Sequence, residues 1–246
     1  MANTNSTSEK GHAKNVANFK TLTTRCTSFP GFNPANSDLQ PAALAATFAS
    51  GDAVIDAVRT ANVAYKLRVA ERATAFRPIS KMITRLGKAL KSSPGISAAV
   101  RQDYIALSRK YRGSRKEAKA NAPAATPDGL QPEQISVAQL SYDSRVAHFL
   151  DIKSFLAALP TYASNEPDLS TAGIAATATA LDTANQAVVV AIANLGNERA
   201  NRNAVLYAPE TGLVATGYQL KDYISSKYGG GSPQWKQISQ LAFSRK

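Results

Sequence analysis

The feature that most constrains this chain is an internal duplication, because two long stretches match when the sequence is shifted by 130 positions. Val16-Ala17-x-Phe19 matches Val146-Ala147-x-Phe149, and Asp38-Leu39 matches Asp168-Leu169. The match continues without a gap to Arg72 and resumes after one inserted residue. Repeats of about 115 to 130 residues are much longer than solenoid units. The sequence therefore predicts two copies of a small domain.

Each copy contains one long stretch that is typical of a helix. The first runs from Pro41 to Phe76, contains no further proline, and repeats its larger apolar residues at steps of three, four and their sums: Leu44, Phe48, Ile55, Val58, Tyr65, Val69 and Phe76. That period keeps one helix face against a partner. Such a helix is roughly 54 Å long, more than one compact domain needs.

Proline and glycine clusters separate the other helical stretches. Around the long helices we expect shorter ones near residues 13–29, 79–90 and 96–119, and near residues 137–159, 211–227 and 233–243. The second long helix is predicted near 169–206, and Asp38 and Asp168 are predicted to cap the long helices. Strand-type alternation is absent, so the fold class is all-α.

The predicted organisation is a disordered tail (1–12), a basic helical repeat 1 (13–119), a linker (120–134) and a near-neutral helical repeat 2 (135–246). Each repeat is a four-helix unit with one long helix. Two arrangements remain open: two adjacent four-helix bundles, or one elongated bundle in which the long hairpins pack along a pseudo-twofold axis.

Charge is distributed unevenly between the two halves. Residues 1–121 hold 20 Lys/Arg and 7 Asp/Glu, a net +13, whereas residues 122–246 hold 9 and 10, a net −1. The predicted polyanion-binding residues are Arg77, Lys81, Arg85, Lys88, Arg109, Lys110, Arg112, Arg115 and Lys116. Lys91 extends the first set, and Tyr104 and Tyr111 are candidates for stacking on bases. The alternative interpretation is a solvated face, or a face that docks on acidic residues in an oligomer.

The chemistry of an active site is missing from the sequence. With one cysteine and two histidines, no Cys/His set closes around zinc. Gly229-Gly230-Gly231 follows a predicted helix and is interpreted as a hinge or C-cap. Cys26 lies on an apolar helix face and is expected to be a buried small hydrophobe. We expect no enzyme, no metal, no cofactor and no small-molecule site.

The expected location is the cytoplasm. The N-terminal residues are polar, without the apolar segment of a secretory signal. No run of about 20 apolar residues appears, so no membrane span is expected. A single cysteine suits a reducing compartment. Leaderless export remains an alternative.

Several phrases form a familiar set: Asn15-Val-Ala-Asn-Phe19, Ile135-Ser-Val-Ala-Gln-Leu-Ser-Tyr-Asp-Ser-Arg145, Asn201-Arg-Asn-Ala-Val-Leu-Tyr207 and Ser232-Pro-Gln-Trp-Lys-Gln-Ile-Ser-Gln-Leu241. Together they resemble a group of uncharacterised bacterial proteins with a duplicated helical layout. The resemblance covers most of the chain and implies this fold and a bacterial setting. It implies no activity.

Two functional hypotheses follow. The first is a non-enzymatic helical protein whose basic repeat 1 contacts nucleic acid or another polyanion through its phosphates or equivalent anionic groups. The alternative is a structural protein that self-associates head to tail, with the basic repeat of one molecule docked on the near-neutral repeat of the next. Such unlike surfaces produce rings or open filaments.

Overall fold

The computed structural model describes residues 11–113 and 140–244, and in these ranges all regular secondary structure is helical. The predicted all-α fold class is confirmed. In chain order the elements are α1 (His12–Thr27), the 3₁₀ helix η1 (Ser37–Leu39), α2 (Pro41–Phe76), α3 (Ile79–Ser92), α4 (Ala98–Arg112), α5 (Tyr142–Ala157), α6 (Thr171–Tyr207), α7 (Leu213–Tyr228) and α8 (Pro233–Ile238).

Most predicted helix ends agree with these bounds to within a few residues. His12, predicted in the disordered tail, instead belongs to the first turn of α1, where its ring lies 2.8 Å from the Tyr207 hydroxyl. Helix α4 ends earlier than predicted because Gly113 adopts the left-handed conformation (φ 66°). Helix α8 ends at Ile238 rather than near residue 243. The predicted linker (120–134) and residues 1–10 lie outside the described residues.

Serine hydroxyl groups accept backbone hydrogen bonds at the start of several helices. The Ser97 and Ser141 side chains accept hydrogen bonds from the N–H groups three residues later, as N-caps do. The Ser170 hydroxyl similarly accepts a bond from the Gly173 N–H at 3.0 Å, at the start of α6. Asp38 lies inside η1, and its own N–H donates to Asn36 Oδ1 at 2.9 Å. The prediction that Asp38 and Asp168 cap the long helices was therefore wrong.

The chain forms two compact units, and each takes helices from both predicted repeats. Unit 1 consists of residues 1–66 and 191–246, and unit 2 of residues 67–190. Helices α2 and α6 each begin in one unit and end in the other. The units thus divide the chain inside the long helices, and not at the predicted linker.

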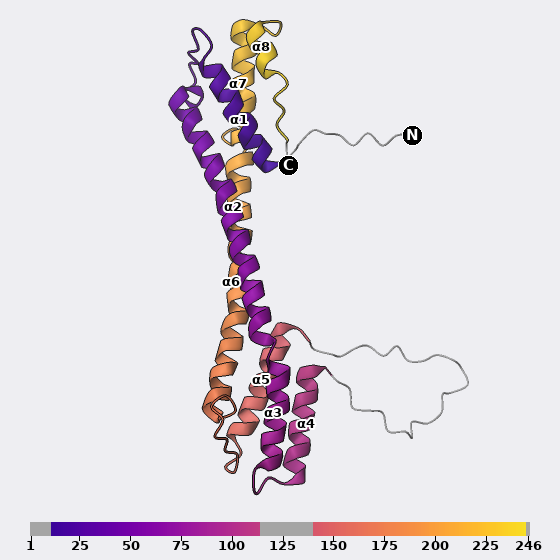
Figure 1. The fold of residues 1–246 in the computed structure, drawn as a ribbon. Coiled ribbons are helices and arrows are strands. Elements are labelled where there is room, and N and C mark those ends of the chain that lie inside the picture. The colour runs from indigo at the N-terminus through magenta and orange to yellow at the C-terminus, as the bar shows by residue number, and fades with distance from the viewer. Residues whose placement is uncertain (1–10, 114–139, 245–246) are drawn as a thin grey trace, which may run out of the picture. The chain divides into compact units, whose positions relative to one another are not determined.

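Unit 1 is built on the contacts of α1 with α7 and α8 (Figure 1). Phe19, Leu22 and Cys26 from α1 are fully buried together with Leu213 and Leu220 from α7. The free Cys26 is the buried small hydrophobe that the sequence predicts. Burial raises the pKa of its thiol to about 12, so the reactive thiolate is disfavoured at neutral pH.

In unit 2, α4 packs against both α3 and α5, and the three helices lie side by side (Figure 1). Helix α3 buries Ile79, Met82, Ile83, Leu86 and Leu90, a spacing of three and four residues that forms one apolar face. The face meets the buried side of α5 and the first half of α6. Its opposite side is free to carry charge.

One stretch of the described chain is long and apolar enough to cross a membrane by length and composition. It runs from Pro41 to Ser92, and 17% of its most apolar window is buried in the structure. Within α2 this stretch carries Asp52, Asp56 and Arg59, and charged groups are costly inside a bilayer. A single such helix is weak evidence, and the absence of a membrane span stays a prediction.

Candidate functional site

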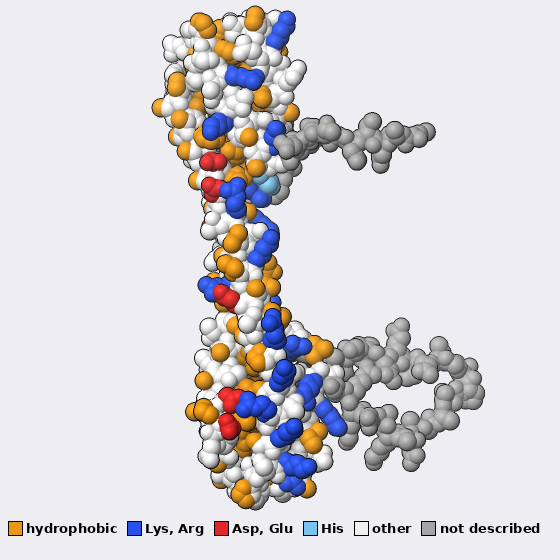
Figure 2. Space-filling model, viewed as in Figure 1, with side chains coloured by type: hydrophobic (Ala, Val, Ile, Leu, Met, Phe, Trp, Pro, Cys, Tyr) orange, Lys and Arg blue, Asp and Glu red, His pale blue; other side chains and the backbone are white. Residues whose placement is uncertain are grey.

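The candidate site is the segment from Arg77 to Gly113, which contains α3 and α4 and is here called the basic hairpin. It carries nine Lys/Arg and a single carboxylate, that of Asp103. Figure 2 shows Lys and Arg side chains gathered over this part of unit 2. No other described segment of similar length has such an excess of positive charge.

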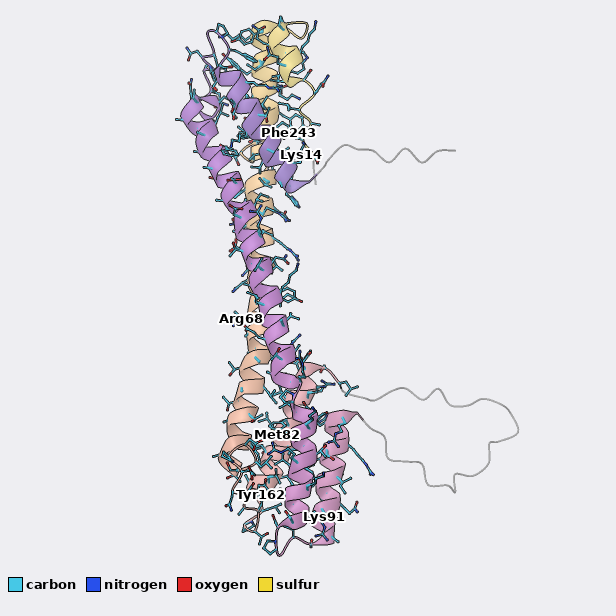
Figure 3. All side chains as sticks on the ribbon, in the orientation of Figure 1. Lys14, Arg68, Met82, Lys91, Tyr162 and Phe243 are labelled. Atoms are coloured by element: carbon cyan, nitrogen blue, oxygen red, sulfur yellow. The ribbon has the colours of Figure 1, made fainter. Side chains whose placement is uncertain are left out.

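The amphipathic pattern of α3 determines which way its cations point. Since one face of α3 is buried against the core, Lys81, Lys88 and Lys91 are exposed on the other side. Lys91 lies in the last turn of α3 (Figure 3), where a cation interacts favourably with the helix dipole. Arg109 and Lys110 occupy the equivalent last turn of α4 and are also exposed.

Helices α3 and α4 are joined by the short segment 93–97 and run antiparallel (Figure 1), and hydrogen bonds tie one helix to the other. The Tyr104 hydroxyl donates to the Ile83 carbonyl at 2.6 Å. Further along α4, Arg112 Nη2 donates to the Ser80 carbonyl at 3.1 Å and to Thr84 Oγ1 at 2.7 Å. The end of α4 therefore lies beside the beginning of α3. Cations from both helices are brought to the same end of the hairpin.

The nine predicted residues fall into three groups. Arg85 pairs with Asp168 through two contacts, one of them 3.2 Å long, and Arg112 is bound to α3, so these two side chains have partners within unit 2. Arg115 and Lys116 lie outside the described residues. The others are exposed and have no ion-pair partner among the described residues: Arg77, Lys81, Lys88, Arg109 and Lys110.

The two tyrosines proposed as a stacking platform are in the core instead. Tyr104 and Tyr111 are each 3% exposed, and the Tyr111 ring packs edge-on against Phe149. Burial raises the pKa of both phenols, that of Tyr111 to about 12. The prediction that they stack on bases was wrong, because they occupy the apolar face of α4 that packs against α3 and α5.

The contrast in charge between the two halves of the chain disappears when charge is counted by compact unit. Residues 1–66 and 191–246 hold 13 Lys/Arg and 7 Asp/Glu, a net +6, and residues 67–190 hold 16 and 10, also +6. The difference of +13 against −1 therefore separates chain halves and not folded units. The local feature that remains is the basic hairpin.

A polar network in unit 2 was not predicted. The Arg72 guanidinium carbon lies 3.9 Å from the Tyr142 ring centroid, and Arg72 Nη1 donates to Asn185 Oδ1 at 3.0 Å. Asn185, only 2% exposed, donates in turn to Asp143 Oδ1 at 2.6 Å. These residues are separated by up to 113 positions along the chain, so local sequence patterns hold no signal for the network. It joins α2, α5 and α6 and holds Arg72 by partners within unit 2.

Within the described residues, no group of three or more His, Cys, Asp or Glu side chains is placed to hold a metal ion. Comparisons of the chain with protein-family models, with curated proteins and with solved structures find no match.

Proposed function

We propose that the protein binds nucleic acid or another polyanion through the basic hairpin. The observation that carries this proposal is the presence of nine Lys/Arg and one carboxylate between Arg77 and Gly113. Six of these cations are exposed and have neither an ion-pair nor a hydrogen-bond partner among the described residues: Arg77, Lys81, Lys88, Lys91, Arg109 and Lys110. Core packing does not require them.

Physical chemistry favours a polyanion as the partner of such a surface. Like charges at three- and four-residue spacings along a helix repel one another by a few tenths of a kcal/mol per pair. A polyanion relieves this repulsion and releases its own condensed counterions. With both tyrosines buried, base stacking is not part of the proposal. The protein would bind phosphates or equivalent groups, and its affinity for nucleic acid would not depend on the nucleotide sequence.

The test is a titration of the full chain against a short labelled DNA duplex, followed by fluorescence anisotropy from about 50 to 300 mM salt. We expect log affinity to fall linearly with log salt. In a variant with Arg77, Lys88, Arg109 and Lys110 replaced by Gln, the slope should decrease by about 0.9 for each phosphate that the protein no longer neutralises. Arg85 and Arg112 are left unchanged because they have partners within unit 2.

The matched control removes the same charge from unit 1. Lys20, Lys66, Arg199 and Lys236 are exposed there, and replacing all four by Gln should leave the salt slope close to that of the wild type. Equal decreases in the two variants would mean that net charge alone attracts DNA. An absence of binding to both DNA and heparin at the lowest salt would contradict the proposal.

A second candidate function is self-association. It is favoured by the exposure of Val189 and Val190 on α6, which are 50% and 57% exposed. Since the compact units have equal net charge, contact between apolar helix surfaces is a better basis for it than attraction between repeats. Light scattering over a concentration series tests it, and a protein that stays monomeric at high concentration and low salt would contradict it.

We also infer that the fold arose by duplication of a four-helix unit. The bounds of α1 and α5 coincide at both ends after a shift of 130 residues, and α2 and α6 coincide at their starts with the same shift. Buried Phe19 and Phe149 occupy equivalent positions. An experimental structure tests the inference, since it requires the two halves to superpose helix by helix.

A further inference from the structure

Unit 2 contains an open groove of about 500 Å³ between the end of α2, α3 and the first turns of α6. Its floor is apolar and includes Ile79, Met82 and Leu181, which are 2%, 8% and 1% exposed, with Ala75 and Ala180 beside them. Figure 3 labels Met82, which lies on α3. Volumes of about 300 to 1,000 Å³ with a mainly apolar lining are typical of small-molecule sites.

Three charged side chains also line the groove. Arg85 pairs with Asp168 through its two terminal guanidinium nitrogens, Nη1 and Nη2, which donate to the two carboxylate oxygens. The third, Lys81, is exposed, and its ammonium group has no partner among the described residues. Because the Arg85–Asp168 pair is neutral as a whole, the groove has one uncompensated positive charge.

The inferred duplication gives the groove an equivalent position in unit 1, where the residues are different. Gly51 corresponds to Leu181 after the shift of 130, and Leu213 corresponds to Met82 after the shift of 131. Leu213 Cδ1 lies only 2.4 Å from the position that a Gly51 Cβ would occupy, so the two elements pack directly together. Gly212 and Thr216 replace Lys81 and Arg85. The fold therefore requires neither the groove nor its cations.

We propose that this groove binds a small amphiphile with one anionic head group, of the medium-chain carboxylate class. The apolar floor buries the hydrocarbon chain, which gains about 0.8 kcal/mol for each buried methylene. The carboxylate is placed at Lys81, where a charge-assisted hydrogen bond stabilises it. A polyanion would leave the floor unused, and a neutral chain would leave Lys81 without a partner.

The test is isothermal titration calorimetry of the full chain with dodecanoate below its micelle concentration. Dodecanol, which has the chain without the charge, and butanoate, which has the charge with little chain, should each bind more weakly than dodecanoate. Lys81→Met should weaken dodecanoate binding about tenfold, as expected for loss of a hydrogen bond to a charged group. Ala180→Phe should block the groove and abolish binding.

Two control variants distinguish binding of dodecanoate in the groove from nonspecific binding elsewhere on the protein. Lys88→Met removes one positive charge from α3, as Lys81→Met does, and Ala176→Phe adds one phenyl ring to α6, as Ala180→Phe does. Lys88 and Ala176 are exposed and do not line the groove. Both should bind dodecanoate as the wild type does. Failure of dodecanoate to bind, equal weakening in Lys81→Met and Lys88→Met, or unchanged binding in Ala180→Phe would each overturn the proposal.

This inference can fail independently of the proposed polyanion function. Ala180→Phe retains every charge of the basic hairpin, so its titration with DNA should match that of the wild type. If dodecanoate does not bind while DNA does, only the groove proposal is overturned. If dodecanoate binds and DNA does not, the groove stands and the polyanion proposal is overturned.

Discussion

At the scale of single residues, two buried tyrosines of α4 differ in one respect that determines their effect on stability. Tyr104 donates its hydroxyl to the Ile83 carbonyl, whereas the buried Tyr111 hydroxyl has no hydrogen-bond partner among the described residues. A buried polar group without a partner costs free energy, and a bonded one contributes about 1 kcal/mol.

We therefore expect opposite outcomes from the same substitution. Tyr104→Phe should lower the free energy of unfolding by about 1 kcal/mol at pH 7, because the Ile83 carbonyl loses its donor. Tyr111→Phe should leave it unchanged or raise it, because the ring is retained and an unbonded hydroxyl is removed. Urea unfolding followed by circular dichroism measures both. A decrease in Tyr111→Phe equal to that in Tyr104→Phe would indicate a partner for Tyr111.

The same residue predicts a dependence of stability on alkaline pH. The pKa of Tyr111 is raised from 10.0 in the unfolded chain to about 12 in the folded one. Its contribution is complete below pH 10 and is lost as the pH rises towards 12, because only the unfolded state then releases the proton. The loss reaches up to about 3 kcal/mol. Tyr111→Phe should therefore lose less stability than the wild type between pH 8 and about pH 11.

At the scale of helices, two glycines of α6 have the same helix propensity and opposite surroundings. A Cβ on Gly173 would lie 2.0 Å from the Pro167 carbonyl oxygen, a backbone atom that cannot move alone. A Cβ on the exposed Gly196 would have no neighbour within 4 Å. Replacement by alanine thus separates the effect of packing from that of propensity.

Gly173→Ala should lower the free energy of unfolding by about 1 to 3 kcal/mol, since the clash outweighs the gain in propensity. Gly196→Ala should raise it by about 1 kcal/mol, the usual difference between glycine and alanine inside a helix. Thermal unfolding followed by circular dichroism compares the two variants. A stabilised Gly173→Ala protein would show that the close approach of Pro167 to Gly173 is not maintained in solution.

The helices themselves were largely predictable, because their signals are local. Apolar spacing identified α3, and Pro41 and Phe76 proved to be the ends of α2. Whether an individual side chain is buried or exposed was not predictable. Tyr104 and Tyr111 lie among cations in the sequence, and only the packing of α4 between α3 and α5 shows that they are buried.

The candidate site was predictable only in part for the same reason. The density of positive charge is visible in the sequence, but the partners of Arg85 and Arg112 are not. Asp168 is 83 residues from Arg85, and its pairing depends on the end of unit 2 where α3 meets the turn before α6. The groove that Lys81 lines has no sequence signal at all, since its lining comes from two segments about 90 residues apart.

At the scale of the whole molecule, folding depends on both halves of the chain. The contacts of α1 with α7 and α8 in unit 1, and of α4 with α5 in unit 2, each join residues of the first half to residues of the second. Either half alone would leave its apolar helix faces without their partners. The predicted repeats are therefore not expected to fold as independent domains, although their sequences match.

Fragments 1–121 and 122–246 test this directly. Expressed separately, each should aggregate, or associate with a second copy of itself, because Phe19 in one and Leu213 in the other lose the core that both belong to. Expressed together, with an affinity tag on one fragment only, they should copurify and recover the circular dichroism of the intact chain. A control pair divided within α2, after residue 66, breaks a helix and should recover less. Cooperative, monomeric unfolding of fragment 1–121 alone would contradict the division into units 1–66 with 191–246 and 67–190, and would favour independent repeats.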